Sequence, residues 1–178
     1  MAQARFCLCC GAPLAPHEEE GRVRLRCAGR DGAPGCGFVH YGNPTPVVAA
    51  IVQQGDDVIL VRNHGWPDGW LGLVTGFLEA GETPEAGVLR ELREELGLAG
   101  TIQSLVGVYA FAQRNELIVA YHVEATGEIV IGPEIEAVKR VPITKLRPWP
   151  FGTGEAVRDW LARWSGGAGS GLTRSRTP

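Results

Sequence analysis

The sequence has no apolar run long enough to cross a membrane. Its longest uncharged apolar run covers residues 47–52, whereas a membrane-spanning helix needs about 20 such residues. The first residues, from Met1 to Cys7, also lack the charged and then apolar layout of a secretion signal. These two absences predict a cytoplasmic protein with no membrane partner.

The sequence also has no excess of basic side chains. It carries 17 Lys and Arg against 20 Asp and Glu, a formal net charge of −3. Because a generic electrostatic partner of nucleic acid is normally basic, we do not expect nucleic acid as a partner. Its 178 residues, of which 44% are hydrophobic and 21% charged, exclude wholesale disorder and suit one core domain with a small appendage.

Cysteine is absent after residue 36. Cys7 and Cys10 are separated by two residues and followed by Gly11, which is typical of a zinc knuckle. Cys27 and Cys36 supply a second pair, and the residues between them are mostly turn formers that could loop out. Since so short a segment has little apolar material with which to fold, we expect a structural Zn²⁺. Its expected ligands are Cys7, Cys10, Cys27 and Cys36.

Other interpretations of the cysteines stay open. The odd number in a chain without an export signal argues against a disulfide framework, and a reduced, metal-free cluster is the alternative to zinc. Cys9 could be a free thiol, or it could compete with Cys7 as a zinc ligand. His17 and His40 are candidate substitute ligands.

The rest of the chain alternates short apolar runs with turn formers. These runs predict strands at residues 47–52, 58–61, 105–112, 117–123, 128–131 and 137–141. Thr83 and Pro84 predict the start of a helix and Gly97 its end after Leu96. A second helix is expected at residues 154–164, and the Gly- and Ser-rich residues 165–178 are expected to form a flexible tail. Mostly strands with two helices indicate a mixed α/β sandwich.

The first helix is rich in carboxylates. Glu91, Glu94 and Glu95 are three and four residues apart and therefore share one face. Carboxylates this close repel one another, and hard divalent cations with oxygen ligands relieve that repulsion. The alternative is a solvated acidic face paired with arginines, which is what most charge runs are.

The segment before this helix decides between the two interpretations. Gly76, then Glu82, then Arg90-Glu91-Leu92-x-Glu94-Glu95-x-Gly97-Leu98 resembles the Nudix box at every fixed position. The junction at residues 38–44 is similar to the one between zinc ribbon and Nudix domain in NADH pyrophosphatase-like members. The resemblance implies a zinc ribbon at residues 1–42 and a Nudix domain at residues 43–164. It also implies the family fold, an α/β (α+β) Nudix-type α/β/α sandwich with a mixed sheet.

The resemblance implies hydrolysis of a nucleoside diphosphate linked to another moiety, with Mg²⁺ or Mn²⁺. Glu94 and Glu95 would bind the metal, Glu91 would be a further ligand or the base, and Arg90 would pair with Glu82. The Gly76 carbonyl is a further candidate ligand. The resemblance also places a late catalytic glutamate near residue 134, where Glu134 is preferred and Glu136 is the competitor.

The sequence outside the box indicates the class of substrate. The aromatic motif of NADH-specific members is missing after the box, and we interpret Trp149-Pro150-Phe151 as a packing corner. Specificity is expected from the loops at residues 63–70 and 109–115. Arg62, next to the first loop, and Arg114, in the second, are candidate partners of phosphates. The aromatics of these loops could stack on a base or belong to the core. Those aromatics are Trp66, Trp70, Tyr109 and Phe111. We expect a small nucleotide substrate such as a dinucleotide or ADP-ribose.

Two further hypotheses concern a regulatory role and a partner of the chain. Some Nudix domains sense a nucleotide and regulate transcription instead of hydrolysing it, although the complete glutamate set favours an enzyme. The zinc ribbon could also pair two copies of the chain as a homodimer.

Overall fold

The computed structural model describes residues 4–167 and divides into two compact units, Met1–Pro44 and Thr45–Pro178. This division falls two residues after the boundary expected at residue 42. Most of the expected tail, residues 168–178, lies outside the described residues. No helix in the described part of the chain is long and apolar enough to span a membrane.

The N-terminal unit is a small antiparallel sheet with little core. Its strands are β1 (Leu14–Glu19), β2 (Arg22–Cys27) and β3 (Val39–His40), in the order β1-β2-β3. Its buried apolar residues are Cys7, Ala12 and Cys27, with Leu14 and Phe38 packed against them. So small a core contributes little to the free energy of folding.

The C-terminal unit is built on one mixed sheet. The strands are β4 (Thr45–Gln54), β5 (Asp57–Asn63), β6 (Val74–Phe77), β7 (Ala99–Phe111), β8 (Glu116–Thr126) and β9 (Ile135–Pro142). The order is β7-β8-β4-β5-β9, and β6 also pairs with β4. Only the β4–β8 pair is parallel among these described strands.

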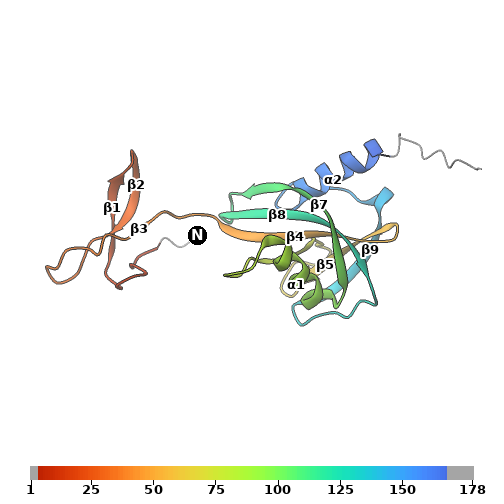
Figure 1. The fold of residues 1–178 in the computed structure, drawn as a ribbon, viewed down its shortest axis with the longest axis horizontal. Helices are drawn as coiled ribbons and strands as arrows, with labels where there is room; N and C mark the ends of the chain where they lie inside the picture. Colours follow the sequence, from red (N-terminus) through yellow and green to blue (C-terminus); the bar gives the residue numbers. More distant parts are fainter. Residues whose placement is uncertain (1–3, 168–178) are drawn as a thin grey trace, which may run out of the picture. The chain divides into compact units, whose positions relative to one another are not determined.

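One helix covers each face of this sheet, as Figure 1 shows. The alternation of strand side chains explains the two layers. Val47, Ala49 and Ile51 of β4 pack in the core that includes α2 (Gly154–Gly167), whereas Val48, Ala50 and Val52 pack in the core that includes α1 (Pro84–Leu96). The α/β/α sandwich with a mixed sheet is therefore confirmed.

Helix α1 begins and ends where the sequence predicts. The Thr83 hydroxyl accepts a hydrogen bond from the Ala86 N–H at 3.2 Å, and Gly97 ends the helix with a left-handed φ of 66°. Leu92 and Leu96 are fully buried against the sheet. Glu91 and Glu95, each two residues from the exposed Arg93, lie on the opposite side of the helix from it, whereas Glu94 is exposed.

The prediction of a strand at residues 128–131 is wrong, because this segment has no strand in the structure. Its backbone hydrogen bonds go to the end of α1 instead of to a sheet: the Val130 N–H donates to the Leu96 carbonyl at 2.9 Å, and the Gly132 N–H donates to the Glu95 carbonyl at 2.8 Å. These carbonyls have no partner within the helix, so the segment satisfies them. Conversely, β6 was not predicted, because its four residues are too few to show a period.

Gly132 offers a test of this docking. A Cβ at this position would lie 2.1 Å from the Glu94 carbonyl oxygen, so Gly132→Ala must push the segment away from α1. We expect the free energy of unfolding to fall by about 2 kcal/mol, as in other overpacked sites, measured by urea denaturation. The control is Glu128→Ala, in the exposed part of the same segment. If both variants are equally stable, the docking contributes nothing.

Candidate active site

The guanidinium of Arg90 joins α1 to the loop that precedes it. Its Nε donates to Glu82 Oε2 at 3.1 Å and its Nη2 donates to Glu82 Oε1 at 2.7 Å. The same Nη2 donates to the Phe77 carbonyl at the end of β6, at 3.1 Å. Two parallel bonds from a guanidinium to a carboxylate fix both orientation and distance. The pairing expected between Arg90 and Glu82 is present, and it lowers the pKa of Glu82.

Arg90 also contacts two of the other glutamates. Its Nη1 lies 2.8 Å from Glu91 Oε1 and 3.0 Å from Glu94 Oε2. These carboxylates raise the pKa of Arg90, with Glu82 as the largest cause. One cation therefore offsets part of the charge of three carboxylates.

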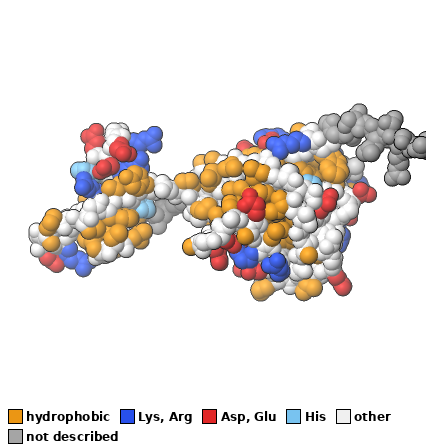
Figure 2. Space-filling view, viewed as in Figure 1, with side chains coloured by type: hydrophobic (Ala, Val, Ile, Leu, Met, Phe, Trp, Pro, Cys, Tyr) orange, Lys and Arg blue, Asp and Glu red, His pale blue; other side chains and the backbone are white. Residues whose placement is uncertain are grey.

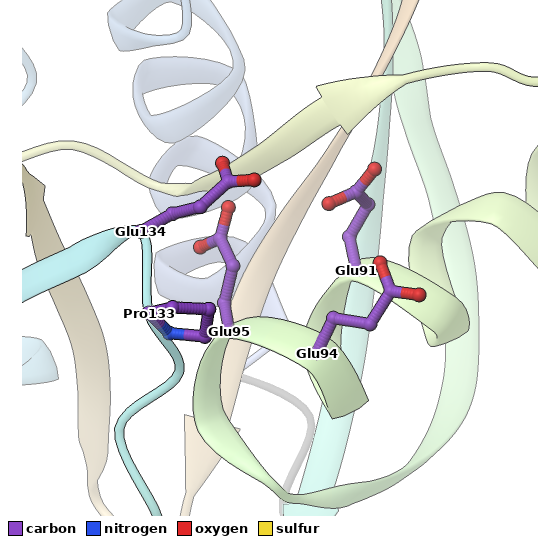
Figure 3. A pocket seen from close by; sticks show the side chains of 5 residues that line it. All are labelled: Glu91, Glu94, Glu95, Pro133 and Glu134. Carbon is purple, nitrogen blue, oxygen red and sulfur yellow. The ribbon is translucent and has the colours of Figure 1, made fainter.

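Four glutamates line one cavity of about 270 Å³, together with Pro133. Figure 3 shows Glu91, Glu94 and Glu95 coming from α1 and Glu134 from the loop before β9. In this view the carboxylates of Glu95 and Glu134 lie next to each other, whereas that of Glu94 turns away from them. The structure thus brings all four expected glutamates to one place, from two segments far apart in sequence.

The least solvated of these carboxylates is that of Glu95. Its side chain is 4% exposed, and its Oε2 has no hydrogen-bond partner. Burial, together with the charges of Glu91 and Glu134, raises the pKa of Glu95 to about 8, although the Thr75 N–H stabilises the carboxylate. Burial also raises the pKa of Glu91. An unpartnered oxygen among crowded carboxylates fits a divalent cation with oxygen ligands.

Gly76 lies directly against this site. It pairs with Val48 across β6 and β4, and a Cβ on it would lie 1.8 Å from Glu91 Oε1. Any larger residue would therefore displace the Glu91 carboxylate. This close approach gives Gly76 a structural reason to be glycine, separate from the ligand role expected for its carbonyl.

The geometry separates the two candidates for the late glutamate. Glu134 lines the cavity of the other glutamates. Glu136 is not among the residues lining that cavity; it accepts a hydrogen bond from Arg62 at 3.0 Å. Arg62 also pairs with Asp68 at 2.6 Å, so both its ion pairs are internal, and the expectation that it contacts a phosphate gains no support.

A NUDIX domain model matches residues 43–163, which is most of the chain and the whole of the glutamate site. The chain belongs to the Nudix family. Among solved structures, a NUDIX hydrolase from Nitrosomonas europaea is similar in fold, with a TM-score of 0.76 and 24% identity, covering 92% of this chain and 94% of that one.

Two kinds of relative are similar in sequence. The NAD-capped RNA hydrolase NudC of Pseudomonas aeruginosa is 33% identical over 92% of this chain and 58% of its own length. An ADP-ribose pyrophosphatase of Methanocaldococcus jannaschii is 28% identical over 71% of this chain and 78% of its own length. The chain spans about half the length of the NudC relatives that it matches.

A second, larger cavity in the Nudix domain is lined by aromatic rings. Its volume is about 830 Å³, within the usual range for small-molecule sites. Trp66, Trp70 and Phe111 come from the two loops expected to carry specificity, and Arg114 also lines it, paired with Glu116 at 3.1 Å. Tyr109 instead donates to Asp159 of α2 at 3.0 Å and packs against the core on that side.

Sequence reasoning missed one wall of this cavity. Trp149 and Phe151 line it, and the Phe151 ring lies 5.4 Å from that of Trp70. The packing-corner interpretation is correct for Trp149, which packs against the core, but incomplete for Phe151, which is 42% exposed. The only available signal was the aromatic cluster itself, because this segment reaches the cavity through the tertiary fold.

The N-terminal unit holds the expected cysteine cluster. The Sγ atoms of Cys7, Cys10, Cys27 and Cys36 all lie within 4.8 Å of one another. The pairs Cys7–Cys36 and Cys10–Cys27 are 3.5 Å apart, close to the separation of about 3.8 Å that a tetrahedron with Zn–S bonds of about 2.3 Å requires.

The surroundings of the cluster also suit thiolates. The backbone N–H groups of Cys36 and Gly29 lower the pKa of Cys27 to about 6, and the Cys9 N–H donates to Cys7 Sγ at 3.4 Å. The pKa of Cys10 is raised instead, to about 12, because the Ala12 N–H, which lowers it, is outweighed by the neighbouring sulfurs together, so the backbone donors favour a thiolate at Cys27 and not at every member of the cluster. All five cysteines are free, and the group contains neither the thiol of Cys9 nor the imidazoles of His17 and His40. The four cysteines could therefore hold one zinc ion.

We expect one zinc per chain in protein purified without a metal-binding tag, measured by elemental analysis. Cys36→Ser should lower that content by at least about half, because it removes one of four thiolates. The matched control is Cys9→Ser, which should retain zinc. Chelation should unfold the N-terminal unit, since its core is too small to fold alone. Zinc retained in Cys36→Ser would show that the ligand set is wrong.

Proposed function

We propose that this protein is a divalent-metal-dependent hydrolase of a nucleoside diphosphate linked to another moiety. The observation that carries the proposal is the convergence of Glu91, Glu94, Glu95 and Glu134 on one cavity, with an unpartnered oxygen on Glu95. A lone acidic helix face would be solvated and would need no second segment. The complete glutamate set also favours an enzyme over a nucleotide sensor.

In this proposal the glutamates would hold Mg²⁺ or Mn²⁺, and the Gly76 carbonyl would be a further ligand. When bound, such ions neutralise the charge of a pyrophosphate and can activate water. Glu91 or Glu134 would accept the proton of the attacking water, whose oxygen bonds to phosphorus as the bridging P–O bond breaks and the other half of the substrate leaves as a monophosphate. Arg90 keeps Glu91 and Glu94 in position while it holds the loop through Glu82.

The aromatic cavity supports a nucleotide as the attached group. Thr75 lines this cavity, and its backbone N–H contacts Glu95 in the other one, so the two cavities meet at β6. A ring bound among Trp66, Trp70 and Phe151 would therefore leave its phosphates near the glutamates. The relatives are named for NAD-capped RNA and ADP-ribose; both contain a nucleoside diphosphate joined to another group. We propose a dinucleotide or ADP-ribose-like substrate.

The glutamates can be tested by single isosteric changes. We expect Glu94→Gln and Glu95→Gln each to lower kcat by at least about a hundredfold with Mg²⁺ or Mn²⁺, because each removes a charged metal ligand. The substrates are NADH, FAD and ADP-ribose, with products resolved by chromatography. Glu79→Gln is the control, because Glu79 is exposed and does not line the cavity. Equal losses in all three variants would show that the helix is only an acidic face.

The products test the substrate class separately. Reaction in labelled water should release AMP and a partner monophosphate, with the label on one phosphate, because water attacks phosphorus. Turnover of nucleoside triphosphates alone, with release of free pyrophosphate, would refute the substrate class while leaving the metal site intact.

The aromatic wall can be tested through KM. We expect Phe151→Ala and Trp70→Ala each to raise KM for the dinucleotide about tenfold and to change kcat less than about threefold, because stacking contributes about 1–3 kcal/mol per ring. Phe6→Ala, an exposed aromatic in the N-terminal unit, is the control. An unchanged KM in both cavity variants would exclude this wall from substrate binding.

A further inference from the structure

The outer face of the N-terminal sheet carries three arginines from one strand. Arg22, Arg24 and Arg26 alternate along β2, and alternate residues of a strand point to the same side. Cys27 of the same strand faces the small core instead. The three arginines are therefore on the side of the sheet away from the cysteine cluster.

Residues of β1 and Tyr41, which directly follows β3, complete this face. Arg24 is paired in register with His17 and Arg22 with Glu19 of β1, so these side chains share the face. The Arg24 guanidinium lies 4.5 Å from the centre of the Tyr41 ring, which is 49% exposed. We refer to these residues as the arginine face: Arg22, Arg24, Arg26, His17, Glu19 and Tyr41.

The charge of this face is positive although the chain as a whole is acidic. Three guanidiniums stand against the single carboxylate of Glu19, which lies 3.8 Å from Arg26. Figure 2 shows acidic side chains at the tip of the β1–β2 hairpin and basic ones beside them in the same unit. The net charge of −3 therefore does not describe the local field that a ligand would meet at this unit.

The internal contacts do not use the donors of the arginine face fully. Arg24 Nη1 reaches the Tyr41 carbonyl at 3.4 Å; its Nε has no partner, but it is buried and therefore closed to a ligand, which leaves Nη2 as its open donor group. Arg26 contacts the imidazole of His17 at 3.1 Å. Among residues 4–167, the Arg22 guanidinium makes no ion pair or hydrogen bond, and Arg22 is exposed.

We propose that the arginine face binds single-stranded nucleic acid. The backbone positions of residues two apart are spaced by about 6.6 Å along a strand, so the three arginines start from a spacing comparable to that of consecutive phosphates in an extended single strand. The stacked Arg24 and Tyr41 add a planar surface for an unpaired base. An acidic peptide would use the charges but not this surface, and a duplex has no unpaired base to offer.

The probe is an unstructured, fluorescein-labelled RNA of about twelve nucleotides, with DNA of the same sequence in parallel. Binding to the full chain is followed by fluorescence anisotropy at several salt concentrations. Arg22→Gln and Arg24→Gln should each weaken binding about three- to tenfold, and the triple variant with Arg26→Gln at least about thirtyfold. The slope of log K against log salt should fall by about two in the triple variant, as the loss of three phosphate contacts requires.

The matched control is Arg5→Gln, which removes the same charge from the same unit outside the arginine face. Tyr41→Ala should weaken binding about tenfold, whereas Tyr41→Phe should retain it, because only the ring is needed. Zinc content checks that each variant is folded. Equal loss in the RNA and DNA arms assigns the site to single strands in general, and loss in RNA alone assigns it to contacts with the 2′-hydroxyl.

Three outcomes would overturn the proposal: no binding at low salt, equal loss in Arg5→Gln, or equal affinity for a duplex or for polyglutamate. Hydrolysis of a free dinucleotide should be unchanged in the variants of the arginine face. The binding measurement therefore tests the arginine face independently of the proposed hydrolase activity.

Discussion

The guanidinium of Arg90 is the contact on which the glutamate site depends. It joins Glu82 of the loop, the Phe77 carbonyl at the end of β6, and two carboxylates of its own helix. Four carboxylates in so small a space would repel one another and bend away into solvent. Because the planar fork of Arg90 binds two of them, Glu91 and Glu94, together with Glu82, the loop, β6 and α1 keep one relative geometry.

Strand β6 connects the two cavities of the C-terminal unit. Gly76 allows Glu91 to approach the backbone, and the Thr75 N–H contacts Glu95 while Thr75 itself lines the aromatic cavity. Carboxylates gather on one side of this short strand and aromatic rings on the other. That separation suits a substrate with a charged diphosphate and a planar ring, since each part meets the chemistry that stabilises it.

The two units rely on different sources of stability. Fully buried aliphatic residues on both faces of β4 hold the C-terminal unit together, whereas three small buried residues form the centre of the N-terminal one. The cysteine cluster fits a metal that would compensate for this small core. A unit held by its centre can leave its outer sheet face to polar side chains, and β2 carries its arginines there.

Local chemistry in the sequence determined much of the fold and of the site. The limits of α1, the shared face of Glu91, Glu94 and Glu95, and the grouping of four cysteines all follow from short spacings, caps and turn formers. Only the tertiary structure decided that residues 128–132 cap α1 instead of forming a strand, and that β6 exists. It also decided that Glu134 faces the glutamates while Glu136 pairs with Arg62, and that Phe151 meets Trp70. Each of these contacts joins segments distant in sequence, so no local period or cap encodes it, and packing around the sheet selects the partner.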